Sequence, residues 1–201
     1  MNRTRSKAGW NAPGGSPLLR QIVVSIRWDN RARGRLIAGP LVIACALGRS
    51  GARVDKREGD GASPIGRFTI LGGFVRRDRF FPGRDTIHLT TTRPSDGWCD
   101  DPASPAYNRR VSLPCRASHE QLWRADGLYH VVLALDHNRV PRRKNRGSAI
   151  FFHLTNDEFG PTAGCVAICL ADMRRLLPRL APRAVMRIVG RGAMGPRPEN
   201  R

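Results

Sequence analysis

The sequence is poor in acidic side chains and has no long apolar segment. It carries 16 Asp and Glu against 35 Lys and Arg, which gives a net charge of +19. Because no run of eighteen apolar residues occurs, no segment is predicted to span a membrane. The longest apolar stretch, 36–47, is interrupted by Gly39-Pro40 and follows a strand-like segment at 21–26. We interpret the two as strands of a folded domain, so no clear signal peptide is visible.

Signatures of metal sites and of nucleic-acid readers are also missing. There is no zinc-finger spacing, RNA-binding aromatic motif, heptad pattern or internal repeat. The Cys165-x3-Cys169 spacing matches neither a thioredoxin-type nor a zinc motif, so neither a metal nor a cofactor is predicted. Arginine clusters at 31–35 and 139–146 predict a basic surface. An anionic polymer of the cell envelope would be attracted to this surface as well as nucleic acid would. We therefore predict no dedicated nucleic-acid binding.

The five cysteines are an odd number, so not all of them can pair. Cys99 and Cys115 have similar loop settings and are the predicted disulfide if the compartment is oxidising. Between them, Asp100 and Asp101 lack the spacing of a calcium loop, which favours capping and turn hydrogen bonds for both.

Length and turn pattern predict one domain with tails. We expect a basic flexible arm at 1–19, a folded domain at 20–190 and a flexible tail at 191–201. Helices are predicted at 118–126, from the capping-box pair Ser118 and Gln121, and at 171–180, from an apolar face. Short β-like runs between turn residues predict strands at 21–26, 41–47, 67–71, 86–90, 128–135, 148–154 and 184–189. The predicted fold class is mainly β with small helices, in a twisted antiparallel assembly.

A histidine and a cysteine stand at two ends of a short interval. His153 lies in the apolar run 150–154, and Cys165 follows the turn 162–164. A free thiol, with a pKa of about 8.5, needs a base near neutral pH, and an imidazole can take its proton and return it to a leaving group. Gly164 permits a sharp turn that leaves N–H groups free to face an oxyanion. The pattern also fits a buried structural thiol, so both interpretations stay open at this point.

Two strings together resemble the L,D-transpeptidase catalytic domain family. One is His153 followed by Thr162-Ala163-Gly164-Cys165; the other is Gly59-Asp60-Gly61-Ala62-Ser63-Pro64-Ile65-Gly66-Arg67-Phe68. The resemblance covers about 20–190 and implies a β sandwich-like domain. It also implies acyl transfer from a tetrapeptide stem of peptidoglycan through a cysteine thioester to an amine. Cys165 would be the nucleophile and His153, oriented by a backbone carbonyl, the base and then the acid. Backbone N–H groups at Gly164 and Cys165 would hold the oxyanion.

The resemblance further implies residues that contact substrate or shape the site. Candidate substrate-binding residues are Thr162, Ala163, Ser63 and Asp60, and Lys56 joins the last two in shaping the floor of the site. The chain departs from the family at Ala163, where a second histidine is common, and at Ala167, where a polar or arginine residue is common. Family members work in the periplasm or cell envelope. An L,D-carboxypeptidase using water, or a non-catalytic basic module binding an anionic polymer, are the alternatives, and the oligomeric state is left open.

Overall fold

The computed structural model describes residues 17–83, 86–156 and 158–190. Its α-helix is α1 (Leu170–Leu176), which runs into a 3-10 turn, η1 (Leu177–Arg179). The strands are β1 (Leu19–Ile26), β2 (Arg33–Ala38), β3 (Leu41–Ala46), β4 (Ala52–Arg53), β5 (Ser63–Pro64), β6 (Gly66–Val75), β7 (Leu89–Thr91), β8 (Asp96–Cys99), β9 (Arg109–Ser112), β10 (His119–Gln121), β11 (Val131–Leu135), β12 (Phe151–Leu154), β13 (Val166–Ile168) and β14 (Leu180–Val189).

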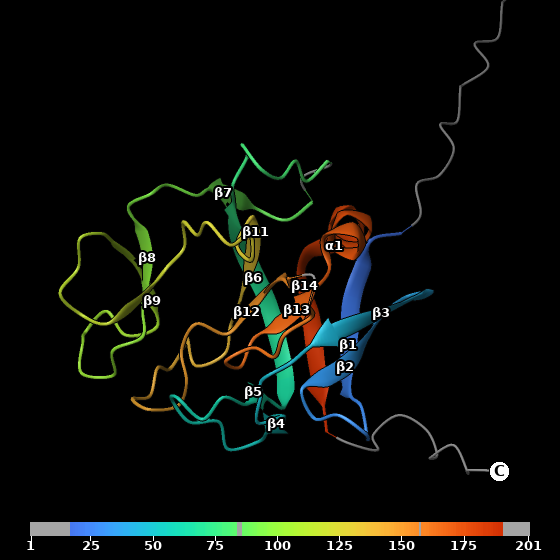
Figure 1. The fold of residues 1–201 in the computed structure, drawn as a ribbon, viewed down its shortest axis with the longest axis horizontal. Coiled ribbons are helices and arrows are strands. Elements are labelled where there is room, and N and C mark those ends of the chain that lie inside the picture. Colours follow the sequence, from blue (N-terminus) through green and yellow to red (C-terminus); the bar gives the residue numbers. More distant parts are fainter. Residues whose placement is uncertain (1–16, 84–85, 157, 191–201) are drawn as a thin grey trace, which may run out of the picture.

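Nine strands form one sheet that closes on itself. Their order is β11-β12-β13-β3-β2-β1-β14-β6-β7, and β11 also pairs with β6. The two halves of this closed sheet face each other as a β sandwich, with α1 at one end (Figure 1). The predicted fold class is confirmed. The expectation of purely antiparallel pairing is wrong, because β1 with β14, β12 with β13 and β6 with β7 are parallel.

Closure depends on β6, which pairs with two strands in succession. Its first half pairs with β14 and its second half with β11, so this single strand joins the two halves of the sandwich. The register with β11 shifts between Ile70 and Gly72, and side chains would not fit at Gly72 and Gly73. A Cβ on Gly73 would lie 2.2 Å from the carbonyl oxygen of Val132, and Gly72 has a φ of +132°. Only glycine lets the two backbones approach so closely.

Side chains alternate along β11, β12 and β13 and therefore supply two separate apolar clusters. Phe152, Leu154, Val166 and Ile168 point into the main core, together with Met173 and Leu176 of α1. Phe151 and Cys165 point to the other face, into a second cluster with Trp98, Leu122 and Tyr129. Because successive side chains of a strand point to opposite faces, the Cys165 side chain lies on the face opposite the main core.

A three-stranded sheet, β10-β8-β9, covers that second face. It stands to one side of the closed sheet (Figure 1), and Trp98 of β8 packs edge-on against Phe151 of β12 at 5.1 Å between ring centroids. The predicted helix at 118–126 is wrong, because 119–121 pairs with β8 as β10. Leu122, which follows β10, is fully buried in the second cluster. Pairing and burial outweigh the local capping-box pattern.

The second predicted helix and the start of the first strand have shifted boundaries in the structure. The helix predicted at 171–180 is α1 with η1, which ends at Arg179 after Pro178. β1 begins at Leu19, inside the predicted arm, whereas 1–16 and 191–201 lie outside the described residues. Cys99 and Cys115, the pair expected to bridge in an oxidising compartment, are both free thiols in the structure. Cys99 lies buried in β8, between β9 and β10, and Cys115 lies in the loop that joins those two strands. In the described ranges no helix is long and apolar enough to cross a membrane.

Candidate active site

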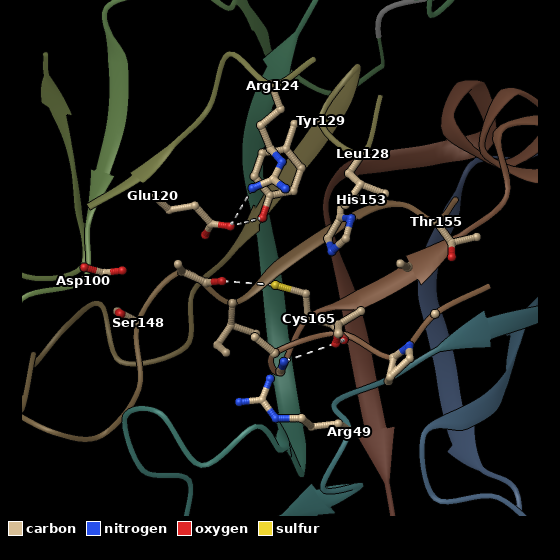
Figure 2. A pocket seen from close by; sticks show the side chains of 18 of the residues that line it. Arg49, Asp100, Glu120, Arg124, Leu128, Tyr129, Ser148, His153, Thr155 and Cys165 are labelled. Atoms are coloured by element: carbon tan, nitrogen blue, oxygen red, sulfur yellow. Dashed lines mark hydrogen bonds and ion pairs between the residues drawn. The ribbon is translucent and has the colours of Figure 1, made fainter. Parts of the chain in front are cut away.

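The parallel pairing of β12 and β13 places His153 and Cys165 on the same face of the sheet. In this register His153 is opposite Ala167, and Cys165 precedes Ala167 by two residues. Because side chains two residues apart share a face, the imidazole and the thiol point to the same side. Both line a cavity of about 610 Å³, as does Ala167 (Figure 2). The thiol is buried, but it lies at a cavity wall rather than within the main core.

The thiol is held by the backbone that leads into β12. Its Sγ–H donates to the carbonyl oxygen of Ala149 at 3.2 Å, and the N–H of Phe151 donates to Sγ at 3.3 Å. Ala149 has a φ of +49°, which is strained for a residue with a side chain. Asn108, which is fully buried, accepts the Ala149 N–H on its Oδ1 at 3.2 Å and the Trp98 indole N–H at 3.0 Å. Asn108 therefore fixes the strained carbonyl that orients the thiol.

The imidazole of His153 is fixed by a backbone carbonyl. Its Nδ1 lies 2.7 Å from the carbonyl oxygen of Leu154, an acceptor, so Nδ1 carries the proton and Nε2 is free to accept one. The ring of Tyr129 meets it edge-on at 5.1 Å. Burial lowers the pKa of His153 and the charge of Arg124 lowers it too, against the raising effect of the Leu154 carbonyl, and the resulting pKa is about 4. At neutral pH the ring is uncharged and able to act as a base.

Two hydroxyls hold the carbonyl of Cys165 in the turn. Thr162 Oγ1 donates to it at 2.7 Å and accepts the Gly164 N–H at 3.1 Å. Ser63 Oγ donates to the same carbonyl at 3.3 Å and accepts the Gly48 N–H at 3.0 Å. Ser63 is fully buried behind the turn, whereas Thr162 also lines the cavity. The structure gives both hydroxyls a partner inside the protein.

Gly164 joins the cysteine turn to the loop 59–68. Its φ is +145°, and a Cβ there would lie 2.9 Å from the backbone oxygen of Ala62. The loop is held by a buried ion pair, Lys56 Nζ to Asp60 Oδ1 at 2.6 Å, and Asp60 also accepts the N–H of Ala62 at 2.8 Å. Burial would raise the pKa of Asp60, but these hydrogen bonds hold it below its ordinary value. The two strings noted in the sequence therefore meet in space.

The family of the chain follows from its similarity to known proteins. The family model described as "L,D-transpeptidase catalytic domain" matches residues 22–188, which is most of the chain. The protein belongs to the L,D-transpeptidase catalytic domain family.

This family consists of cysteine-dependent transpeptidases. Among solved structures, the chain is similar to that of Mycobacterium tuberculosis L,D-transpeptidase 1, with 8% identity and a TM-score of 0.36. The match covers 85% of this chain and 62% of the other. No curated protein matches the sequence.

The cavity contains the cysteine turn and also residues that the sequence did not single out. Arg124, Tyr129 and Glu120 line it beside His153 (Figure 2). Tyr129 Oη donates to Glu120 Oε1 at 2.5 Å, and the Arg124 guanidinium lies 5.1 Å from the Tyr129 ring centroid. Glu120 and Arg124 fall within the segment predicted as a helix, which hid their place in the site. Ala163, where the family commonly has histidine, also lines the cavity, whereas Asp60 does not.

The surroundings of Cys165 disfavour its ionised form. Burial and, after it, the carboxylate of Glu120 raise the pKa of the thiol to about 12. The Phe151 N–H and the charge of Lys56 act in the other direction but do not compensate. With His153 uncharged, the resting pair is a neutral thiol and a neutral imidazole.

Proposed function

We propose that the protein is a peptidoglycan L,D-transpeptidase that works through a thioester on Cys165. The observation that carries this proposal is the shared cavity face of Cys165 and His153, with the imidazole locked so that Nε2 is its free nitrogen. The membership of the family supports it. Because family members are associated with the cell envelope, we place the reaction there.

In the first half-reaction, His153 Nε2 takes the thiol proton as Sγ attacks the carbonyl carbon of the stem. The C–S bond forms, and the oxyanion accepts hydrogen bonds from the turn. The Gly164 N–H is already donated to Thr162, so the Cys165 N–H is the donor we assign to the oxyanion. The imidazolium then protonates the departing amine of the terminal D-residue as the C–N bond breaks. Thr162, Ser63 and Gly164 position the turn, and Thr162 and Ala163 border the substrate.

In the second half-reaction an amine attacks the thioester carbon. His153 takes a proton from the attacking nitrogen, the new C–N bond forms, the C–S bond breaks, and the proton returns to the thiolate. Water in place of the amine would give L,D-carboxypeptidase activity from the same residues. The nature of the acceptor, rather than the nucleophile, separates the two reactions.

The test of the nucleophile is covalent capture. Incubation with a carbapenem should add one adduct to the intact protein, mapped by digestion to Cys165 and absent from Cys165→Ala. An adduct that persists in Cys165→Ala would overturn the proposal. Digestion is needed because four other cysteines are free. Stem tetrapeptides incubated with and without an acceptor amine then separate cross-linked product from hydrolysed product.

A further inference from the structure

One half of the sandwich is built from five strands, β3, β2, β1, β14 and β6, that carry arginines but no Asp or Glu. Side chains alternate along these strands between the main core and the outer surface. One outward row crosses all five strands in register, and it consists of Val42, Ile37, Val23, Arg187 and Arg67. Together with Arg35, two residues before Ile37 on β2, this row defines what we call the arginine face.

The arginines of this face have no counter-charge. Arg35, Arg67 and Arg187 are exposed, and none of them forms an ion pair within the described residues. Arginines elsewhere in the structure do pair, as Arg110 does with Asp96. Arg187 lies directly opposite Arg67 in the antiparallel pair of β14 and β6, and like charges in that position destabilise a sheet. An external anion would relieve this repulsion.

Apolar side chains accompany the arginines on the same face. Val42 is 66% exposed, and Ile37 and Val23 beside it are half-buried. A soluble polyanion gains nothing from an exposed valine. The surface of an anionic bilayer takes up apolar side chains at the boundary of headgroups and acyl chains, and its lipid charges attract basic side chains. The combination therefore favours a bilayer over nucleic acid or a soluble polymer.

Charge also argues against a partner supplied by this protein itself. The segments 1–16 and 191–201, which lie outside the described residues, together contain six Lys and Arg and one Glu. A second copy seated on the same face in a two-fold contact would bring arginines against arginines. Both occupants would add positive charge to a face that already has an excess.

We propose that the arginine face docks the protein on the surface of an anionic lipid bilayer. The active site lies on the other outer surface of the sandwich, because Cys165 points away from the main core on the half that contains β12 and β13. In Figure 1, β8 and β9, which cover that surface, stand on the side away from β1, β2 and β3. Docking therefore leaves the cavity open on the side away from the bilayer.

Co-sedimentation with vesicles tests the docking face. Vesicles of equal parts phosphatidylglycerol and phosphatidylcholine are compared with vesicles of phosphatidylcholine alone, and the wild-type protein should bind only the anionic ones. Arg35→Gln/Arg187→Gln should bind them about thirtyfold more weakly, because each arginine at an anionic surface contributes about fivefold. The matched control Arg116→Gln/Arg143→Gln removes two exposed arginines from loops outside the five strands. It should change binding less than about threefold, since salt screens these charges from a bilayer on the arginine face.

A pair of valine variants separates a bilayer from a soluble polyanion. Val42→Thr keeps the size and the β-branching of the side chain but replaces a methyl group by a hydroxyl. It should weaken vesicle binding about fourfold, the effect of one buried methyl group, and leave the binding of soluble polyphosphate unchanged. The control Val54→Thr, at a residue that is 81% exposed just after β4, should change neither.

Three results would overturn the proposal. They are no binding of anionic vesicles by the wild-type protein, equal weakening in the two arginine double variants, and equal vesicle binding by Val42→Thr and Val54→Thr. The second would assign binding to the overall charge, and the third to a soluble polyanion. Arg187→Gln removes the repulsion with Arg67, so the double variant should fold, and thermal unfolding checks this. Vesicle binding needs no peptide substrate and is therefore independent of the proposed function, whose failure shows as loss of the carbapenem adduct on Cys165.

Discussion

Replacing Gly164 by alanine tests whether the loop 59–68 and the cysteine turn act as one unit. The new Cβ would lie 2.9 Å from the backbone oxygen of Ala62, and an L-residue would be strained at a φ of +145°. Strain at such a φ costs about 1–2 kcal/mol, and overpacking against backbone adds about 1–3 kcal/mol. We expect a loss of about 3 kcal/mol in the free energy of unfolding, which is roughly 6–12 °C in Tm for a domain of this size.

The matched control is Gly59→Ala. Gly59 also has a positive φ, +71°, but a Cβ there would meet nothing within 4 Å. It therefore reports the strain alone, about 1–2 kcal/mol. Thermal unfolding gives the stability of each variant, and the rate of carbapenem acylation gives the alignment of the thiol. Gly164→Ala should acylate about a hundredfold more slowly, because a shift of about 1 Å in the turn misplaces Sγ. Equal stability and equal acylation in the two variants would refute the reasoning.

Three further perturbations test the surroundings of the pair. Thr162→Val removes the 2.7 Å hydrogen bond to the Cys165 carbonyl and the acceptor of the Gly164 N–H. Chemical denaturation should show a loss of about 1–2 kcal/mol in the free energy of unfolding, and acylation should slow. Unchanged acylation would contradict a positioning role for Thr162. Asn108→Ala leaves the buried N–H groups of Trp98 and Ala149 unpaired, so the free energy of unfolding should fall by about 3 kcal/mol and acylation should slow. The control Asn138→Ala loses only hydrogen bonds within its loop and should slow acylation little. The pKa of His153 is about 4 in the folded protein and 6.5 in the unfolded chain, so the unfolded state binds more protons between these pH values. The free energy of unfolding should therefore fall by about 3 kcal/mol as the pH drops from about 6.5 to 4. His153→Gln should lose this part of the pH dependence, and a profile identical to that of the wild type would show that the imidazole is not buried uncharged.

Much of the sheet could be predicted because its strands are short, apolar and bounded by turn residues. The segments around 21–26, 41–47 and 148–154 are strands in the structure, with boundaries moved by a few residues. The segment 118–126 was mispredicted because a capping-box pattern describes only local preference. There the structure gains more from pairing Glu120 with Trp98 and burying Leu122 than from a helix. The same mistake concealed Glu120 and Arg124, which depend on that strand for their place in the cavity.

By itself the sequence determined the chemical types and their order: a histidine in an apolar run, a glycine before a cysteine, and the loop 59–68 upstream. These are local properties, because alternation, turn formation and glycine conformations depend on neighbouring residues. Only the tertiary structure decided that β12 and β13 pair in parallel, which turns His153 and Cys165 to one face. It likewise decided that the Ala149 carbonyl accepts a hydrogen bond from the thiol and that Asp100 and Glu120 line the same cavity. Strand register and contacts between distant loops are set by packing of the whole domain, which no local pattern encodes.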